Sequence, residues 1–199
     1  MTLATLAYEG KTIIAQELTP EAFAKFGNVI SSKEMINKPV PAPGTAFGNI
    51  FSHRDAVIPV DNYDQSTTNK NSHCSFTLQR FVPPATIDRE KGVYNVVVIE
   101  RHPMTSQSFF PMGVDGSKPA YLVIVVENDS NGMPDLSTVK AFIARGGQSV
   151  TYGAAVWHGG TCSLQDHLDM TMIMYSNGVA ADELELVSIE NGMKVEWTA

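Results

Sequence analysis

Alternating and continuous apolar stretches follow one another through most of the chain after residue 73, and they predict β-strands. Residues 75–82 alternate polar and apolar side chains, which is the period of a half-buried strand, and 96–99 is a continuous β-branched run typical of a buried strand. Strand candidates are 75–82, 93–102, 108–110, 120–126, 138–144, 149–152, 168–175 and 184–189. Glycine, proline or asparagine separates nearly every pair, so the pattern predicts an all-β barrel or sandwich.

The N-terminal part predicts a short entry strand at 13–18 followed by one short helix. Thr19 is a suitable helix N-cap, and Gly27 is a suitable stop. Between them Phe23 and Phe26 lie three residues apart on one face. We therefore expect a single helix held on the core by two aromatic rings, without a chemical role.

The length of 199 residues predicts a single domain over 1–199. Residues 1–44 would supply the N-terminal strand, the helix and a proline-rich extended connector at 37–44, and residues 73–190 would form the barrel. The segment 61–72 is polar and almost free of apolar residues, which predicts an exposed loop that could act as a lid over the barrel.

Charge and cysteine usage exclude several classes of partner. The formal net charge is −7, and no cluster of lysine and arginine is longer than two, so we expect neither nucleic acid nor a membrane surface as a partner. No stretch approaches the roughly 20 apolar residues of a membrane span. Cys74 and Cys162 match neither a disulfide framework nor a zinc spacing, which indicates reduced thiols in a cytoplasmic protein.

The first candidate for chemistry lies at the end of the predicted strand 93–102. Residues two apart in a strand share a face, so Glu100 and His102 should point the same way and Arg101 the opposite way. Gln107 returns to the same region after a turn. A carboxylate, an imidazole and an amide at one place can hold a metal ion or a small polar substrate. The alternative is a strand end turning into solvent, where charged residues are ordinary.

The second candidate is the segment 146–158, where glycines permit a tight turn before a short strand and the chain then reaches Trp157 and His158. A histidine beside a tryptophan is more often a packed, hydrogen-bonded residue than a ligand, so His158 keeps both interpretations at this point. Tyr152 and Trp157 could form the wall of a substrate pocket or be ordinary core aromatics.

These two segments carry a resemblance to cupins. The spacing Glu100-x-His102-x4-Gln107-x5-Gly113 resembles the first cupin motif, and 146–158 resembles the second motif with its final histidine ligand. Glu100 stands where cupins usually have histidine, and Gln107 stands where they have glutamate.

A closer resemblance is to the ureidoglycolate lyase family, long called ureidoglycolate hydrolases. It rests on four segments in the right order, 18–30, 100–112, 134–143 and 152–158, which together extend over nearly the whole chain. The resemblance implies a cupin-like double-stranded β-helix, or jelly-roll barrel, that forms a homodimer. It also implies cleavage of ureidoglycolate to glyoxylate and urea in allantoin and purine breakdown, with a divalent metal, often nickel, and no organic cofactor.

The resemblance assigns the metal to Glu100, His102, Gln107 and His158, a mixed nitrogen and oxygen set that suits nickel, manganese or zinc. Gln107 and His158 could instead bind the ureido group by hydrogen bonds.

Ureidoglycolate carries a hydroxyl, a carboxylate and a urea nitrogen on one carbon. Its cleavage requires removal of the hydroxyl proton, binding of the carboxylate, and protonation of the departing nitrogen. His102 or Glu100 is the expected base. Arg80 is expected to bind the carboxylate, with Lys140 as the second, catalytic cation; the alternative for both is an ordinary charged residue at a solvated strand edge.

Two functions of other classes remain open on the sequence alone. The chain could be a metal-dependent cupin enzyme that acts on another small hydroxy or keto acid, as an isomerase or a dioxygenase does. It could also be a non-catalytic cupin that binds a small polar ligand. Oxygen uptake with bound iron would indicate the first, and thermal stabilisation by a ligand without turnover would indicate the second.

Overall fold

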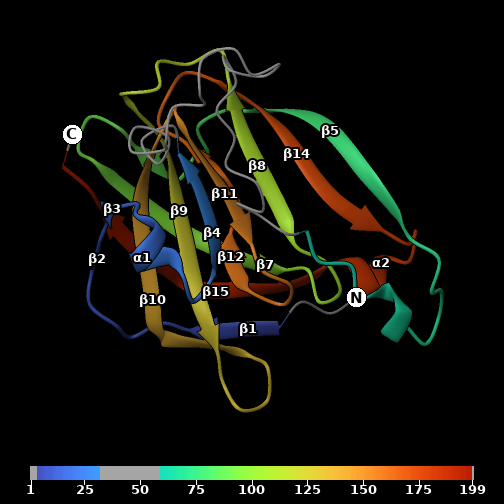
Figure 1. Cartoon of the computed structure of the whole chain (residues 1–199). Coiled ribbons are helices and arrows are strands. Elements are labelled where there is room, and N and C mark those ends of the chain that lie inside the picture. The colour runs from blue at the N-terminus through green and yellow to red at the C-terminus, as the bar shows by residue number, and fades with distance from the viewer. Residues whose placement is uncertain (1–3, 32–58, 199) are drawn as a thin grey trace, which may run out of the picture.

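The computed structural model describes residues 4–31 and 59–198, which lie mostly in two β-sheets (Figure 1). The large sheet has the order β1 (Ala4–Ala7), β15 (Glu185–Glu196), β7 (Val93–Arg101), β12 (Trp157–Gly159), β9 (Pro119–Asn128), β10 (Pro134–Arg145) and β3 (Gln16–Glu17), with β2 (Ile13–Ile14), β6 (Ile87–Asp88) and β13 (Cys162–Ser163) paired beside this path. The five-stranded sheet has the order β4 (Gly27–Ser31), β11 (Gln148–Tyr152), β8 (Gln107–Met112), β14 (Leu168–Ser176) and β5 (His73–Phe81). Short helices are α1 (Pro20–Phe23), the one-turn η2 (Tyr63–Gln65) and α2 (Ala180–Glu183).

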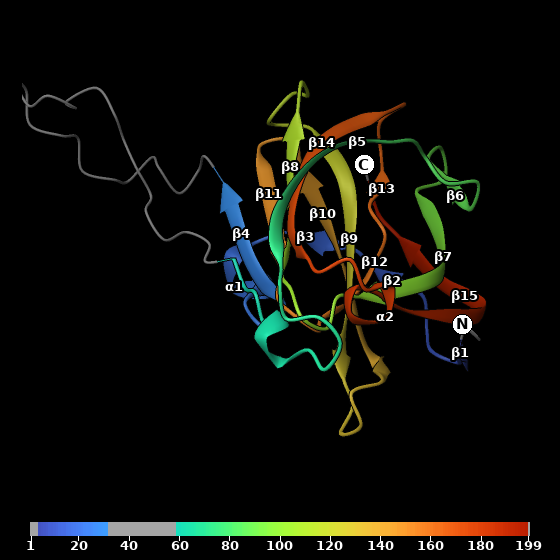
Figure 2. The same ribbon diagram turned by 90° about the vertical axis from the view of Figure 1, so that its right-hand side faces the viewer.

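The chain passes repeatedly from one sheet to the other, from β7 to β8, then to β9, and again from β14 to β15. Most pairs are antiparallel, and Figure 2 shows the two sheets facing each other. This crossing of antiparallel strands between two layers is the arrangement of a jelly-roll barrel. The predicted all-β, cupin-like fold with a short N-terminal helix is confirmed.

The helix forms where its sequence signals predict it. The side-chain oxygen of Thr19 accepts a hydrogen bond from the backbone N–H of Ala22, at 3.2 Å, and Phe23 and Phe26 are buried. The Phe23 ring contacts the rings of Phe142 and Tyr152, each at 6.0 Å between centroids. The two rings hold this segment on the core, as expected, but α1 ends at Phe23, and Phe26 lies in the turn that follows it.

Strand β9 shows why the large sheet is buried on both faces. Val123 and Val125 belong to the core between the sheets, whereas Leu122 and Ile124 belong to a second core on the opposite face. Because both faces are covered, β9 is a continuous apolar run without alternation.

Strand β5 has the predicted period of two, with its apolar face turned outward. Phe76 and Leu78 are 71% and 69% exposed, while Phe81 contacts the core residue Phe109 at 5.8 Å between ring centroids. Alternation then directs the side chains that share the face of Phe81 toward the barrel interior. These side chains are Ser75, Thr77 and Gln79.

The segment 61–72 is mostly exposed, as expected, and a few of its residues anchor it on the barrel. Tyr63 is fully buried, its hydroxyl donates to the Tyr175 carbonyl at 3.3 Å, and burial raises its pKa to about 12. The side-chain amides of Asn69 and Asn177 each donate to the backbone carbonyl of the other, both at 2.8 Å. We call residues 60–72 the strap, because they are fixed across the end of β14.

The connector predicted at 37–44 lies outside the described residues, and the boundaries 1–44 and 73–190 stay predictions. None of the described helices is long and apolar enough to cross a membrane. Both cysteines are free, with Cys74 exposed and Cys162 buried.

Candidate metal and active site

The ends of β7 and β12 bring Glu100, His102 and His158 together. His158 lies directly opposite Glu100 in the antiparallel pairing of these strands, and the potential ligand atoms of the three residues lie within 4.8 Å of one another. Gln107 begins β8, and its Oε1 atom lies 3.2 Å from His158 Nε2. The four residues that the two motifs predicted as a metal set thus form one cluster.

Backbone carbonyls fix the orientation of both imidazoles. His102 Nδ1 lies 2.6 Å from the carbonyl oxygen of Glu183, and His158 Nδ1 lies 2.9 Å from that of Val156. A carbonyl only accepts hydrogen bonds, so in the neutral rings the proton is on Nδ1 and the lone pair is on Nε2. This is the arrangement in which a histidine ligates a metal through Nε2.

The free lone pairs meet inside the barrel. His158 Nε2 lies 3.2 Å from Gln107 Oε1 and 3.6 Å from Glu100 Oε1. In the described part of the chain, His102 Nε2 is the one buried side-chain nitrogen or oxygen without a hydrogen-bond partner. Acceptors facing one another need a proton or a cation between them, and a buried polar atom without a partner is rare in folded proteins.

The pKa shifts follow from burial and from the mutual approach of these groups. Burial, and then the nearby His158, lower the pKa of His102, which keeps its imidazole neutral at pH 7. Burial tends to raise the pKa of Glu100, but the close approach of His158, at 3.6 Å, and of His102 outweighs it and leaves the pKa below its ordinary value. The cluster therefore holds a carboxylate beside a neutral imidazole.

This donor set fits a divalent metal ion. Ligands about 2.0–2.2 Å from an ion can be at most about 4.4 Å apart, so the observed separations need only a small closing movement. Two imidazoles with oxygen ligands suit nickel, manganese or zinc, and no thiol is present in the cluster. Glu100, His102 and His158 would hold the ion, with Gln107 beside them.

Tyr152 supports the cluster from the side. Its ring is stacked on the imidazole of His158, with 4.0 Å between centroids and 9° between the planes. Tyr152 also lies opposite Gln107 in the pairing of β11 with β8. Tyr152 is also a buried member of the core between the sheets, and its role as a wall of a substrate pocket stays a prediction.

Comparison with known proteins identifies the family of this chain. The family model of ureidoglycolate lyase matches residues 10–196. The chain belongs to the ureidoglycolate lyase family. Its similarity to the ureidoglycolate lyase of Schizosaccharomyces pombe is 37% identity over 94% of this chain and 96% of the relative. With the ureidoglycolate lyase of Saccharomyces cerevisiae it shares 31% identity over 83% of this chain and 87% of the relative. With the ureidoglycolate lyase of Chelativorans it shares 30% identity over 82% of this chain and 84% of the relative.

The two cations that the sequence suggested for a ureidoglycolate lyase site are not at the cluster. Arg80 points to the outer face of β5, where its guanidinium makes two hydrogen bonds of 2.7 Å with Asp169. Lys140 is exposed beside α1, with its ammonium 5.7 Å from the centre of the Phe26 ring. In the structure neither side chain is placed to contact a substrate at the cluster.

Trp157 also faces away from the cluster. Its ring is buried in the second core, its Nε1 donates to the Gly132 carbonyl at 3.0 Å, and the Arg101 guanidinium lies 4.7 Å above it. Because Trp157 and His158 are adjacent in β12, they must point to opposite faces of the sheet. The interpretation of Trp157 as a core aromatic is therefore the one that the structure supports.

Sequence reasoning missed the carbonyl of Glu183 and the row of inward-facing residues beside the cluster. Ser75 pairs with Met174 and Met174 pairs with Gln107, so these side chains follow one another across three strands. The Gln107 amide contacts the Met174 sulfur at 3.9 Å. The alternation of 75–82 was the available signal for Ser75, but the pattern does not say which face is inside.

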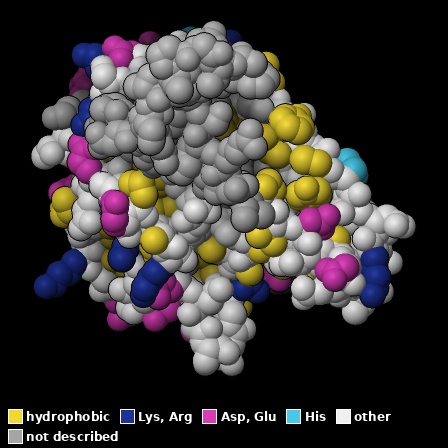
Figure 3. Space-filling model, in the orientation of Figure 1, with side chains coloured by type: hydrophobic (Ala, Val, Ile, Leu, Met, Phe, Trp, Pro, Cys, Tyr) yellow, Lys and Arg dark blue, Asp and Glu magenta, His cyan; other side chains and the backbone are white. Residues whose placement is uncertain are grey.

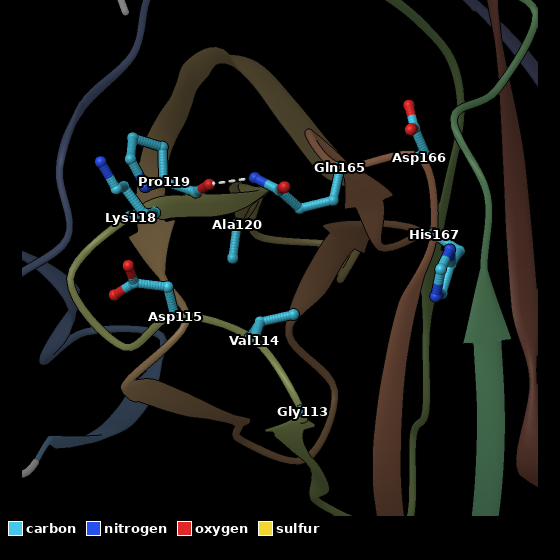
Figure 4. Close-up of a pocket in the computed structure, with 9 residues that line it drawn as sticks. All are labelled: Gly113, Val114, Asp115, Lys118, Pro119, Ala120, Gln165, Asp166 and His167. Atoms are coloured by element: carbon cyan, nitrogen blue, oxygen red, sulfur yellow. Dashed lines mark hydrogen bonds between the residues drawn. The ribbon is translucent and has the colours of Figure 1, made fainter.

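A cavity of about 350 Å³ lies at the other end of β8, and none of the four cluster residues lines it (Figure 4). Its lining residues are Gly113, Val114, Asp115, Lys118, Pro119, Ala120, Gln165, Asp166 and His167. The Gln165 amide donates to the Pro119 carbonyl at 2.7 Å, which closes one side of the cavity. Charges of both signs line it, and we assign it no role.

Proposed function

We propose that this chain is a ureidoglycolate lyase that breaks the C–N bond of ureidoglycolate and releases glyoxylate and urea. The observation that carries the proposal is the buried Nε2 lone pair of His102, which has no hydrogen-bond partner among the residues that the structure describes and lies beside Glu100 and His158. Membership of the family points to the same reaction.

His102 and Glu100 are the candidate groups for the first proton transfer. One of them takes the proton of the substrate hydroxyl, and the C–O bond becomes the carbonyl of glyoxylate while the C–N bond breaks. The departing nitrogen then takes a proton and leaves as urea. The lowered pKa of His102 leaves its Nε2 lone pair free at pH 7, and this lone pair can either take the proton or ligate an ion, but not both. Glu100 is therefore the candidate base when an ion is bound at Nε2. General acid–base catalysis contributes typically about 10²–10⁴-fold.

We propose that a divalent ion, nickel by the family resemblance, binds at Glu100, His102, Gln107 and His158. When bound it would supply Lewis acidity toward the hydroxyl and carboxylate oxygens of the substrate. The neutral Gln107 adds no charge to attract the ion, so we expect binding weak enough to be lost on purification.

The inner face of β5 is proposed to bind the polar ends of the substrate. Ser75 and Thr77 carry hydroxyls 3.5 Å apart, and both lie on the strand face that is directed into the barrel. Hydroxyls can donate to a carboxylate or accept from a ureido N–H. We propose this role for them in place of Arg80 and Lys140.

The groups in the cluster favour a lyase over an amide hydrolase. Attack on the ureido carbonyl requires an activated water or a nucleophile beside a base, and neither Cys74 nor Cys162 belongs to the cluster. Elimination of urea needs only a base, a proton donor and groups that bind the substrate. These are the functions that imidazole, carboxylate and amide groups can serve.

The test is a product assay on the purified protein, with and without chelator and added metal. We expect urea and glyoxylate in equal amounts and no ammonia, with activity lost on chelation. His102→Ala should lower turnover by about a hundredfold or more. Ammonia in place of urea would overturn the lyase assignment, and full activity without metal would show that the four residues bind substrate directly. Turnover of another hydroxy acid, or binding without turnover, would favour the two other classes of cupin.

We also propose a homodimer, which the family resemblance implies. Strand β5 is an edge of the five-stranded sheet and carries two of the most exposed large apolar side chains, Phe76 and Leu78. Figure 3 shows hydrophobic side chains gathered over the side of the molecule where β5 and β14 lie. Exposed apolar strand edges are normally covered in solution. A monomeric mass by light scattering at micromolar concentration would contradict the dimer.

A further inference from the structure

The crossover between β14 and β15 contacts the candidate site at one point, the carbonyl oxygen of Glu183. This oxygen lies 2.6 Å from His102 Nδ1. It is the contact that keeps the proton on Nδ1 and leaves the lone pair of Nε2 directed into the barrel, where no group of residues 4–31 or 59–198 forms a hydrogen bond with it. The orientation of His102 therefore depends on where the backbone of residue 183 is held.

That backbone belongs to a helix too short to be stable alone. Helix α2 has four residues, Ala180–Glu183, and isolated helices of this length do not form in water. Its last residue folds its own side chain back over the preceding turn. Glu183 Oε1 accepts hydrogen bonds from the backbone N–H groups of Asn177, at 3.0 Å, and Gly178, at 2.7 Å, and from the hydroxyl of Ser176.

We propose that Glu183 is a positioning residue for His102. Its carboxylate clamps the turn at 176–178, and this clamp holds the carbonyl of the same residue at His102 Nδ1. Hydrogen bonds to an ionised acceptor are roughly twice as strong as neutral ones, so three of them on a single oxygen can fix a short crossover. Without the clamp the carbonyl moves, and the neutral ring of His102 populates both tautomers.

The neighbouring Asp182 supplies a matched control. It accepts hydrogen bonds from the Ser66 hydroxyl, at 2.7 Å, and from the Asn177 side-chain amide, at 2.8 Å. It is an acid of the same helix with partners in the same turn and in the strap, but its carbonyl makes no contact with either histidine of the cluster. Removal of Asp182 should loosen the crossover without releasing His102.

The first experiment records the ¹⁵N signals of the histidine rings in the metal-free protein. In the parent protein His102 should show the proton on Nδ1. Glu183→Ala should give a mixture of the two His102 tautomers. Glu183→Gln retains Oε1 as an acceptor and should restore most of the parent signal. Asp182→Ala should leave the His102 signal unchanged. If Glu183→Ala does not fold, Glu183→Asp, which keeps the charge and loses the reach, takes its place. An unchanged His102 tautomer in the variant that folds would overturn the proposal, and so would an equal change in Asp182→Ala.

The second experiment measures turnover of the same variants with metal added. Loss of a residue that orients a ligand typically costs about 10–100-fold in activity or metal affinity, so Glu183→Ala should lose that much in kcat, with partial rescue in Glu183→Gln. This expectation rests on the proposed function of His102. The role of His102 in the reaction and the role of Glu183 in positioning it can fail separately. A fully active His102→Ala variant would show that His102 is not needed for the reaction. The tautomer signals of His102 would still report whether Glu183 positions its ring.

Discussion

The imidazole of His158 lies flat on the phenol ring of Tyr152, with 4.0 Å between their centroids and 9° between their planes. Tyr152 is buried, and burial raises its pKa, so its hydroxyl stays protonated in the physiological range. The ring of His158 thus has a neutral aromatic wall on one face and a carbonyl at Nδ1. Together they restrict the direction in which its Nε2 points.

A substitution at Tyr152 should separate the effect of the ring from that of its hydroxyl. Tyr152→Phe keeps the stacked ring, and we expect its turnover to stay within a few-fold of the parent. Tyr152→Leu removes the ring and should cost about 10–100-fold in kcat, because the imidazole is no longer held. Steady-state kinetics check this, with urea unfolding to confirm that both variants are folded. Equal losses in both variants would assign the effect to the hydroxyl instead.

The local part of the site could be predicted from the sequence because it depends on strand period alone. Glu100 and His102 share a face of one strand, and the same rule correctly directed Arg101 away from them. The rule applies equally to Trp157 and His158, and it would have placed Trp157 in the second core. The pairing of His158 with Glu100 depends on which distant strands become neighbours, and the sequence reached it only through the resemblance to cupins.

The positions that the sequence failed to predict depend on tertiary structure. The alternation in 75–82 does not tell which face is inside, and the contact of Phe81 with Phe109 turns Arg80 outward. Likewise the predicted strand 184–189 continues through Asn191 and Gly192, which have positive φ angles of 60° and 73° and form an irregularity in the pairing with β7. An Asn-Gly pair is typical of a turn, but here β15 continues past it and pairs with β7 again from Met193.

Arg80 should be dispensable for catalysis. The Arg80 side chain is 63% exposed, and its guanidinium forms an ion pair with Asp169 on the outer face of the sheet. We expect Arg80→Ala to leave kcat/KM within about twofold and the urea midpoint of unfolding close to that of the parent, since exposed ion pairs contribute little. A tenfold rise in KM would return Arg80 to the carboxylate of the substrate. Ser75→Ala, which removes a hydroxyl from the inner face, serves as the contrasting variant and should raise KM.

A fall in pH should weaken the hydrogen bond by which Asp182 holds Ser66 of the strap. Hydrogen bonds from Ser66 and then Asn177 lower the pKa of this carboxyl in the folded protein. A carboxyl with a lowered folded pKa contributes stability above its unfolded pKa of about 3.9, and this stability is lost as the pH falls through the folded value. Asp182→Asn should therefore be less stable than the parent at pH 7, and the difference between their urea midpoints should narrow in acid. A difference that does not change with pH would contradict this.

Glu100 should decide the affinity of the site for metal. Its pKa is lowered in the cluster, so at pH 7 it supplies the one negative charge among the three grouped side chains, Glu100, His102 and His158. Glu100→Gln keeps the size and one oxygen of the side chain but removes that charge, and we expect metal affinity to fall at least about tenfold and activity to fall with it. Calorimetric titration with nickel and elemental analysis measure the affinity and content.

Glu185→Gln is the control for Glu100→Gln on the neighbouring strand, because its carboxylate pairs with Arg101, at 2.7 Å, and not with the cluster. It should keep the metal affinity of the parent while losing a comparable surface charge. Equal metal affinity in parent and Glu100→Gln would remove Glu100 from the ligand set and leave it as a candidate base. Equal losses in Glu100→Gln and Glu185→Gln would show that the fall reflects the general negative field of the protein, which carries a net charge of −7, and not coordination by Glu100.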